Sequence, residues 1–447
     1  MRSKTRDMTQ GSPTPVMLSF AVPILLGNLF QQFYNTVDAI VVGQYEGEAA
    51  IAAIGVANPI MSIAIFFLFG VCIGISVLLA QLYGAQDWDT FRLETSTALI
   101  GGLVFSIGFS LFCFLLAEPL LRITQTPPDI LEPARGYLQI ISLGLVFSFL
   151  YNFCAAGLRA TGDSRAPFLF LLCSSLLNIA LDIAFVGGLG MGVQGAAAAT
   201  VLSQAVSCLL SVVYIYRTRS ILALRRGQFR FDMGLMKKTA SYSWASALQQ
   251  TFIYIGRLLV QTVVNTFGTS VIAGYNSAVR IEGFLLSTQQ AMGDSEATFC
   301  AQNAGARRLD RVRAGFWGAN KFNLAYSVLL GVLLAVFAPA LIRLFTNSGQ
   351  AEMIPTGVFY LRFMIPFYML SGVTNAMQGM FRGIGMLRLT AACTALQIVW
   401  RIIFSYLFGF QFGLPAICLA TGTGWVVMVI VEGVYVKRYF DSHREMA

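Results

Sequence analysis

The sequence predicts an all-α integral membrane protein with twelve transmembrane helices in two pseudo-symmetric six-helix lobes. Three observations predict this class: a high apolar content, twelve long apolar segments and an internal repeat. Of the 447 residues, 56% are hydrophobic and only 11% are charged, whereas a soluble domain usually has about 25% charged residues. Lipid offers no partner to backbone polar groups, so we expect the apolar segments to be helices.

Each apolar segment is long enough to cross the roughly 30 Å hydrocarbon core as a helix. Segments 60–82 and 98–117 are two examples of such uninterrupted apolar sequence. The twelve predicted spans lie near residues 16–44, 49–82, 94–118, 135–158, 167–187, 193–217, 238–265, 271–301, 314–343, 355–381, 390–409 and 414–437.

The two halves of the chain resemble each other. A shift of 221 residues places "AQLYGAQDWDTFR" (80–92) over "AQNAGARRLDRVR" (301–313). The matched residues are largely polar or lie in loops, and chance similarity between apolar helices does not produce such matches. We therefore expect an N-terminal lobe 1–216, a basic linker 217–237 and a C-terminal lobe 238–447. Six spans per half give both lobes the same orientation, which is typical of parallel-repeat transporters.

The net charge of +9 admits two interpretations, a nucleic-acid surface or a membrane orientation signal. Most of the thirty Lys and Arg residues fall in alternate connections between spans, and the other side receives Arg122, Arg135 and Arg343. This asymmetry follows the positive-inside rule. We expect a monomer in a bacterial plasma membrane, with both termini cytoplasmic, lipid around it and no nucleic-acid partner.

The sequence offers little for enzymatic chemistry. It has one histidine, His443, in the polar tail, and its eight cysteines are dispersed through the apolar segments. No CxxC pair is present and one histidine leaves zinc sites and His-based catalysis almost no ligands, so we interpret the cysteines as small packing residues. We expect no enzyme activity and no cofactor other than a coupling ion. The acidic "DWD" at 87–89 is more simply a solvated turn than the metal motif of a membrane transferase.

Polar residues inside the predicted spans are costly in lipid and indicate partners or a function. Gln31, Asn35 and Asp38 share one helical face in the first span, and Asn178 and Asp182 share one in the fifth. Bringing these faces to Thr200 in the sixth span would give a set of oxygen ligands suited to Na⁺, or a proton shared between carboxylates. The alternative is that the two aspartates only bond neighbouring helices or cap irregular backbone near the first-span proline.

The second half does not repeat this chemistry, because Leu259 stands opposite Asp38. Its predicted spans contain Arg257, Arg280, Glu282 and Arg401, which either pair across helices or contact substrate. Aromatic and methionine side chains can repack around varied ligands. Our candidate residues for a substrate cavity are Tyr34, Tyr151, Arg257, Gln261, Glu282 and Met292.

Several motifs resemble those of the multidrug and toxic compound extrusion (MATE) family over essentially the whole chain. They are "NTVDAIVVG", "GLRATGDSRAP", "NIALDIAFVGGLGMGVQGAAAAT", "AQNAGARRLDRVR" and "GMFRGIGMLR". The resemblance implies two lobes in a V shape and export of amphipathic, often cationic, drugs in exchange for Na⁺ or H⁺. It also implies a cation site at Asp38, Asn178, Asp182 and Thr200, and helix bending at Pro23.

The chain departs from one branch of the family, which uses further acids in the seventh and tenth spans. No Asp or Glu lies between Arg362 and Phe381, and the seventh span has Arg257 instead. The N-terminal acids are therefore the favoured coupling site. A flippase for lipid-linked saccharides in the same superfamily is the alternative function, in which Arg257, Arg280 and Arg401 would hold a pyrophosphate.

Overall fold

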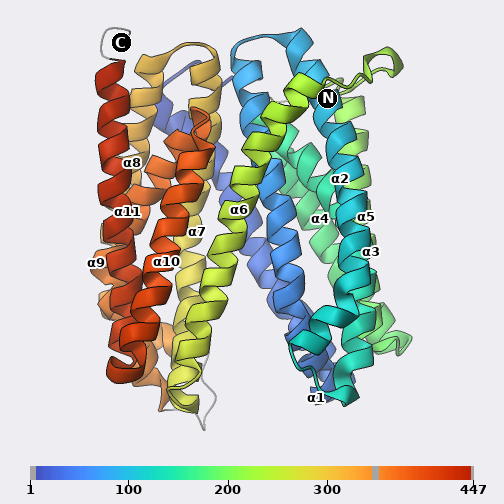
Figure 1. Ribbon diagram of the computed structural model, residues 1–447, viewed down its shortest axis with the longest axis vertical. Helices are drawn as coiled ribbons and strands as arrows, with labels where there is room; N and C mark the ends of the chain where they lie inside the picture. Colours follow the sequence, from blue (N-terminus) through green and yellow to red (C-terminus); the bar gives the residue numbers. More distant parts are fainter. Residues whose placement is uncertain (1–6, 345–351, 444–447) are drawn as a thin grey trace. The chain divides into compact units, whose positions relative to one another are not determined.

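The computed structural model describes residues 7–344 and 352–443, without the side chains of 34–43 and 46–49 (Figure 1). The described chain is helical, with short π- and 3₁₀-helices between longer α-helices. In chain order the elements are α1 (Pro13–Gly84), α2 (Trp88–Ile123), α3 (Pro128–Ala160), α4 (Arg165–Asp182), η1 (Ile183–Gly188), α5 (Gly192–Arg217), η2 (Arg226–Gln228), α6 (Met233–Val264), α7 (Thr269–Gly305), α8 (Leu309–Arg343), α9 (Met353–Gly383), α10 (Leu387–Phe412) and α11 (Leu414–Ser442).

The helices confirm the predicted membrane class. Helix α1 contains 72 residues and would be about 108 Å long if it were straight, so it cannot be a single span. It contains two candidate spans, Pro13–Phe33 and Ala50–Gly84, among the ten in the described residues. Helices α6 and α7 cover the seventh and eighth predicted spans with a more polar sequence.

The chain forms two compact units that differ from the two sequence halves at the first helix of each half. Of the described residues, unit 1 contains Asp7 and 26–251, and unit 2 contains 8–25, 252–344 and 352–443. The beginning of α1 therefore packs within unit 2, and the beginning of α6 packs within unit 1. The lobe boundaries at 216 and 238, which come from the sequence repeat, stay a prediction, and the packing units divide the chain at other residues.

In unit 1, two glycines allow α6 to approach α1 closely. Gly70 and Gly74 are four residues apart, and a Cβ on either would fall under 3.0 Å from the backbone of α6 at Ala247 and Ser243. The Ser243 hydroxyl donates a hydrogen bond to the Val71 carbonyl at 2.9 Å. Small residues at this spacing let membrane helices pack backbone to backbone, which fixes the first half of α6 to unit 1.

In unit 2, hydrogen bonds hold the chain start in the equivalent way. Ser295 on α7 donates to the Met17 carbonyl at 2.7 Å, and the Asn303 amide donates to the Met8 carbonyl at 3.1 Å. Arg311 on α8 donates to the same carbonyl at 3.1 Å. The repeat shift of 221 residues places 8–25 over 229–246. The beginning of the first helix in each sequence half therefore packs in the unit formed mainly by the other half.

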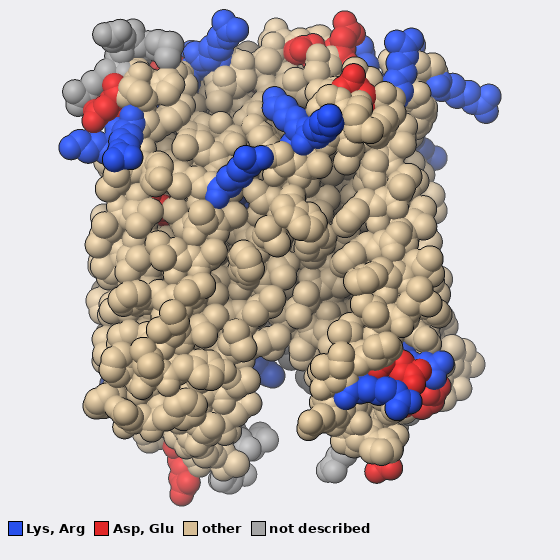
Figure 2. Space-filling model, viewed as in Figure 1, with Lys and Arg blue, Asp and Glu red and all other residues tan. Residues whose placement is uncertain are grey.

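The remaining helices pack within their own units. In unit 1, α3 packs against α2 and α5, and α5 packs against α4; in unit 2, α9 packs against α7, α8 and α11. Large apolar side chains such as Val104 and Leu115 face outward, as expected where lipid replaces water. Figure 2 shows that Lys, Arg, Asp and Glu gather near the helix ends of each unit on the face drawn.

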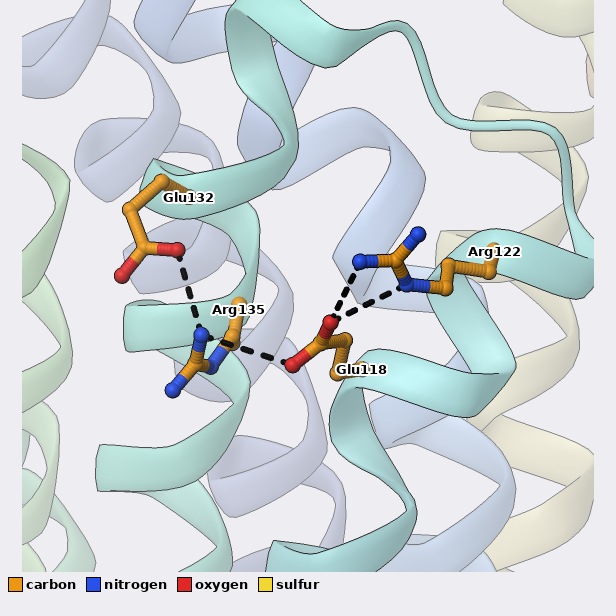
Figure 3. A network of polar contacts seen from close by, with 4 residues as sticks. All are labelled: Glu118, Arg122, Glu132 and Arg135. Atoms are coloured by element: carbon orange, nitrogen blue, oxygen red, sulfur yellow. Dashed lines mark hydrogen bonds and ion pairs between the residues drawn. The ribbon is translucent and has the colours of Figure 1, made fainter.

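Two of the basic residues expected on the outer membrane face are paired with acids (Figure 3). Arg122 lies 2.7 Å from Glu118 on α2, and Arg135 on α3 lies 3.4 Å from Glu118 and 3.3 Å from Glu132. Their positive charges are balanced locally.

Candidate functional site

Asn178 and Asp182 lie on one buried face of α4. With Ser174 they are spaced four residues apart, so their side chains follow one line along the helix. Asn178 is 2% exposed and Asp182 is 0% exposed, and Ser174 is also buried. A carboxyl group buried at membrane depth is unfavourable unless it has a partner or binds an ion.

The backbone changes directly after Asp182. Helix α4 ends at this residue and continues as the π-helix η1, and π segments inside helices are common at functional sites. Neither the oxygen nor the nitrogen of the Asn178 amide has a hydrogen-bond partner among the described residues. A buried amide left in this state costs about 1–3 kcal/mol, so an ion bound to its oxygen would offset part of that cost.

Helices α1 and α4 run in the same direction along this face. A Cβ on Gly27 of α1 would lie 3.5 Å from the Leu171 side chain, and a Cβ on Gly187 in η1 would lie 2.8 Å from the Tyr45 ring. The two contacts occur in the same order along both helices. Asp182 lies between Leu171 and Gly187.

Thr200 lies on α5, which packs against both α4 and η1. A Cβ on Gly195 of α5 would lie 3.2 Å from Phe185 Cβ in η1. Because a short loop joins η1 to α5, the two run in opposite directions. Thr200 lies five residues after Gly195 on α5. Because the two segments are antiparallel, the position opposite it lies about five residues before Phe185, which is between Asn178 and Asp182. The Thr200 hydroxyl donates to the Ala196 carbonyl at 3.1 Å, which leaves its oxygen lone pairs as acceptors.

The rest of the predicted first-span face is only partly described. The side chains of Tyr34, Asn35 and Asp38 lie outside the described residues. Gln31 is exposed, and Pro23 is buried within an uninterrupted stretch of α1.

In unit 2, Glu282 on α7 is the centre of a charged cluster. Its Oε2 accepts a hydrogen bond from the Tyr360 hydroxyl of α9 at 3.2 Å. The charges of Arg401 and Arg257 also act on this carboxylate, although neither guanidinium forms a direct ion pair with it within the described residues. Arg257 is exposed and Arg401 is half-buried. Arg280 is exposed and is absent from this cluster.

The remaining cavity candidates have different surroundings. Tyr151 donates to the Pro167 carbonyl at 3.1 Å, and the Gln261 amide donates to Asn265 at 2.9 Å. Met292 is 0% exposed and lies in a hydrophobic cluster of unit 2. The assignment of Met292 to a substrate cavity stays a prediction.

Three fully buried acids escaped the sequence analysis: Glu94, Glu296 and Glu432. Glu94 accepts a hydrogen bond from Thr239 at 2.6 Å, and Glu432 accepts one from Gln378 at 2.9 Å. Neither oxygen of Glu296 has a hydrogen-bond partner among the described residues. Since all three fall within predicted spans, with Glu94 at the first residue of 94–118, a complete list of charges in those spans would have identified them.

Asp163 in the "GDSRAP" motif has a structural role. One oxygen accepts hydrogen bonds from the backbone N–H groups of Arg165 and Ala166, each at 3.1 Å. The other accepts one from the Tyr214 hydroxyl at 2.8 Å. This carboxylate caps the start of α4 and joins it to α5, in agreement with the preference for Asp before helix N-termini.

Comparison with known proteins relates most of the chain to one family. The family model described as MatE matches residues 23–184 and 245–407, once in each half. The chain is 29% identical over 427 residues to "Probable multidrug resistance protein YpnP" of Bacillus subtilis, covering 95% of this chain and 94% of that protein. It is 27% identical over 342 residues to "FAD transporter" of Shewanella oneidensis, covering 75% of each.

Solved structures share the fold. One, described as the outward-facing conformation of a multidrug resistance MATE family transporter of the MOP superfamily, has a TM-score of 0.92 and 24% identity, with 100% of both chains covered. Another, a MOP superfamily transporter from Pyrococcus furiosus, has a TM-score of 0.92 and 23% identity, with 99% of both chains covered.

Proposed function

The chain belongs to the MatE family of multi-pass membrane transporters, and from this premise we propose that it exports amphipathic, often cationic drugs in exchange for Na⁺ or H⁺. Relatives named as multidrug resistance proteins support drug efflux. We further propose that the chain acts as a monomer in the bacterial plasma membrane, with both termini in the cytoplasm.

The observation that carries the proposal is the buried face of α4 that contains Asn178 and Asp182 and ends where η1 begins. We assign the coupling ion to Asp38, Asn178, Asp182 and Thr200. In sequence, Asp38 lies between Gly27 and Tyr45. Gly27 is close to α4 before Asp182, and Tyr45 is close to η1 after Asp182. This order supports pairing of the two aspartates. Carboxylate, amide and hydroxyl oxygens are ligands that suit a hard cation, and two adjacent carboxylates also suit a shared proton.

The mechanism we propose is conformational linkage. A cation bound between the two aspartates neutralises them and favours one arrangement of the two halves, in which drug is released outward. Release of the cation toward the cytoplasm restores the other arrangement. The ion shifts this equilibrium only as far as its affinities for the two arrangements differ.

Reconstituted vesicles test the proposal. Full-length protein is placed in vesicles, and efflux of a cationic dye is followed while sodium and pH gradients are imposed separately. We expect one gradient to drive efflux in the native protein, and Asp182→Asn and Asp38→Asn to abolish that efflux. Efflux at the native rate from a folded Asp38→Asn protein would overturn the assigned site.

Asp163→Asn is the matched control for Asp182→Asn. Both changes remove a buried carboxylate from unit 1, but the oxygens of Asp163 are used in capping α4 and binding Tyr214. We expect Asp163→Asn to lower the stability of the protein. The fraction that remains folded should still show gradient-driven efflux. Equal loss of efflux in both variants would mean that burial, and not ion binding, explains the effect.

The second candidate is transport of an anionic substrate, such as the pyrophosphate of a lipid-linked saccharide. A relative named "FAD transporter" and the exposed Arg257 favour it. The Glu282 carboxylate weakens it, because this acid acts on two of the three guanidiniums that would hold the anion. In the same vesicles, transport of an anionic dye by the native protein, and loss of that transport in Arg257→Gln, would favour this candidate.

A further inference from the structure

A groove of about 630 Å³ lies in unit 2 between the beginning of α8 and the end of α11. Val373 and Met377 of α9 also line it. The groove involves none of the residues assigned above to the coupling ion. Its lining combines three cations, three aromatic rings and several aliphatic side chains.

The cations of the groove are Arg313, Lys321 and Lys437, and all three are exposed. Asp441 is the one acid in the lining, so positive charge is in excess. None of the three cations forms an ion pair in the described part of the chain. The Arg313 guanidinium lies 5.8 Å from the centre of the Phe440 ring, which positions it at the groove.

Polarity changes along the groove. Arg313 is near the start of α8, and Lys437 and Asp441 are near the end of α11. Leu324 lies about 16 Å further along α8 than Arg313, and Val373 lies well before the end of α9. Arg313 and Lys437 are therefore near the helix ends, and Leu324 and Val373 are closer to the middle of their helices. Lys321 lies one helical turn before Leu324, between these two regions.

Two further features fit an amphipathic ligand in lipid. Trp317 is 52% exposed beside the cations, and tryptophan is enriched at the level of lipid headgroups. Gly433 of α11 borders the groove, and a Cβ at this position would meet no atom within 4 Å. The absence of a side chain here leaves open space between α8 and α11.

We propose that this groove binds one anionic phospholipid. Its phosphate lies at Arg313 and Lys437, and one acyl chain lies along Leu324 and Val373. Basic pockets between transmembrane helices are suited to anionic headgroups, and the aliphatic part distinguishes a lipid from a soluble phosphate. The groove shares no residue with the proposed ion site or with the candidate substrate cavity, so this inference does not depend on the proposed function.

Native mass spectrometry of the purified full-length protein tests the site. The protein is incubated with equal amounts of phosphatidylglycerol and phosphatidylcholine, and the retained lipids are counted. We expect preferential retention of phosphatidylglycerol. Replacing Arg313 and Lys437 by Gln should weaken that retention about fivefold per cation removed, as expected for basic residues near an anionic surface.

Arg438→Gln is the matched control, because Arg438 is next to Lys437 in sequence and does not line the groove. We expect this variant to retain phosphatidylglycerol as the native protein does. Equal weakening by Arg438→Gln and Lys437→Gln would overturn the proposal, since the effect would then be one of general surface charge.

Gly433→Leu tests the apolar part without removing a charge. Its side chain enters open space, and we expect it to lower retention of both lipids while the melting temperature is kept. Gly108→Leu is its control, because a Cβ on Gly108 also meets nothing within 4 Å but lies on α2 of unit 1. Unchanged retention by folded Gly433→Leu would overturn the proposal, as would equal thermal stabilisation by inorganic phosphate and phosphatidylglycerol.

Discussion

Arg382 of α9 forms an ion pair with Asp294 of α7, with 2.9 Å between Nη1 and Oδ1. The Arg382 and Asp294 side chains are 10% and 27% exposed. The charge of Arg382 also acts on Glu296, which is fully buried on α7. One guanidinium of α9 thus forms an ion pair with one acid of α7 and acts electrostatically on a second.

We expect Arg382→Gln to lower the free energy of unfolding by about 3 kcal/mol, because removing one partner of a buried pair leaves the other charge uncompensated. Asp294→Asn should cost less, since Arg382 would still act on Glu296. Thermal unfolding in detergent measures both. Arg92→Gln is the control, because the Arg92–Asp89 pair is exposed at 3.9 Å and such pairs contribute little. A larger loss from Asp294→Asn than from Arg382→Gln would contradict this account.

The charged cluster at Glu282 predicts energetic coupling with Arg401. Tyr360→Phe should cost about 1 kcal/mol, the usual contribution of one hydrogen bond. Glu282→Gln should cost more, because it removes the negative charge that acts on Arg257 and Arg401. In a double-mutant cycle, Glu282→Gln with Arg401→Gln should show a coupling energy of about 0.5–3 kcal/mol. Additive effects on thermal unfolding would show that the two charges are independent.

The close approach of α1 and α6 predicts a position-specific effect of glycine substitution. Gly74→Leu should greatly reduce the yield of folded protein, because the new side chain would overlap the backbone at Ser243. Gly55→Leu is in the same helix, and a Cβ there meets nothing within 4 Å. It should be tolerated, and both variants are compared by size-exclusion profile and melting temperature. Similar behaviour of the two would contradict close packing at Gly74.

Asn178→Leu separates an ion-binding role from a structural role. The native amide has no hydrogen-bond partner among the described residues, so its replacement by an apolar group should cost little stability in the absence of the ion. The native protein should be stabilised by its coupling ion, by about 2.7 kcal/mol at a hundred times the dissociation constant. We expect Asn178→Leu to lose this gain.

The readout is the melting temperature with and without Na⁺, and across pH for the proton. Asp163→Asn serves again as the control and should melt at a lower temperature while it keeps the ion-dependent gain. A full ion-dependent gain in Asn178→Leu would remove the amide from the proposed ligand set.

The sequence alone predicted the membrane class, the spans, the duplication and the shared face of Asn178 and Asp182. These features follow from local rules. Lipid requires helices in long apolar segments, and a spacing of four residues places two side chains on one helical face. The same local information could not place Met292 in the hydrophobic cluster of unit 2, because periodicity does not state which neighbour a helix face meets.

Tertiary structure alone decided which faces meet. It showed that the beginnings of α1 and α6 are exchanged between the sequence halves, that Glu282 accepts a hydrogen bond from Tyr360, and that a basic groove lies between α8 and α11. These contacts join residues tens to hundreds of positions apart. Their energies depend on the close fit of particular side chains, and a pattern within one helix does not contain that information.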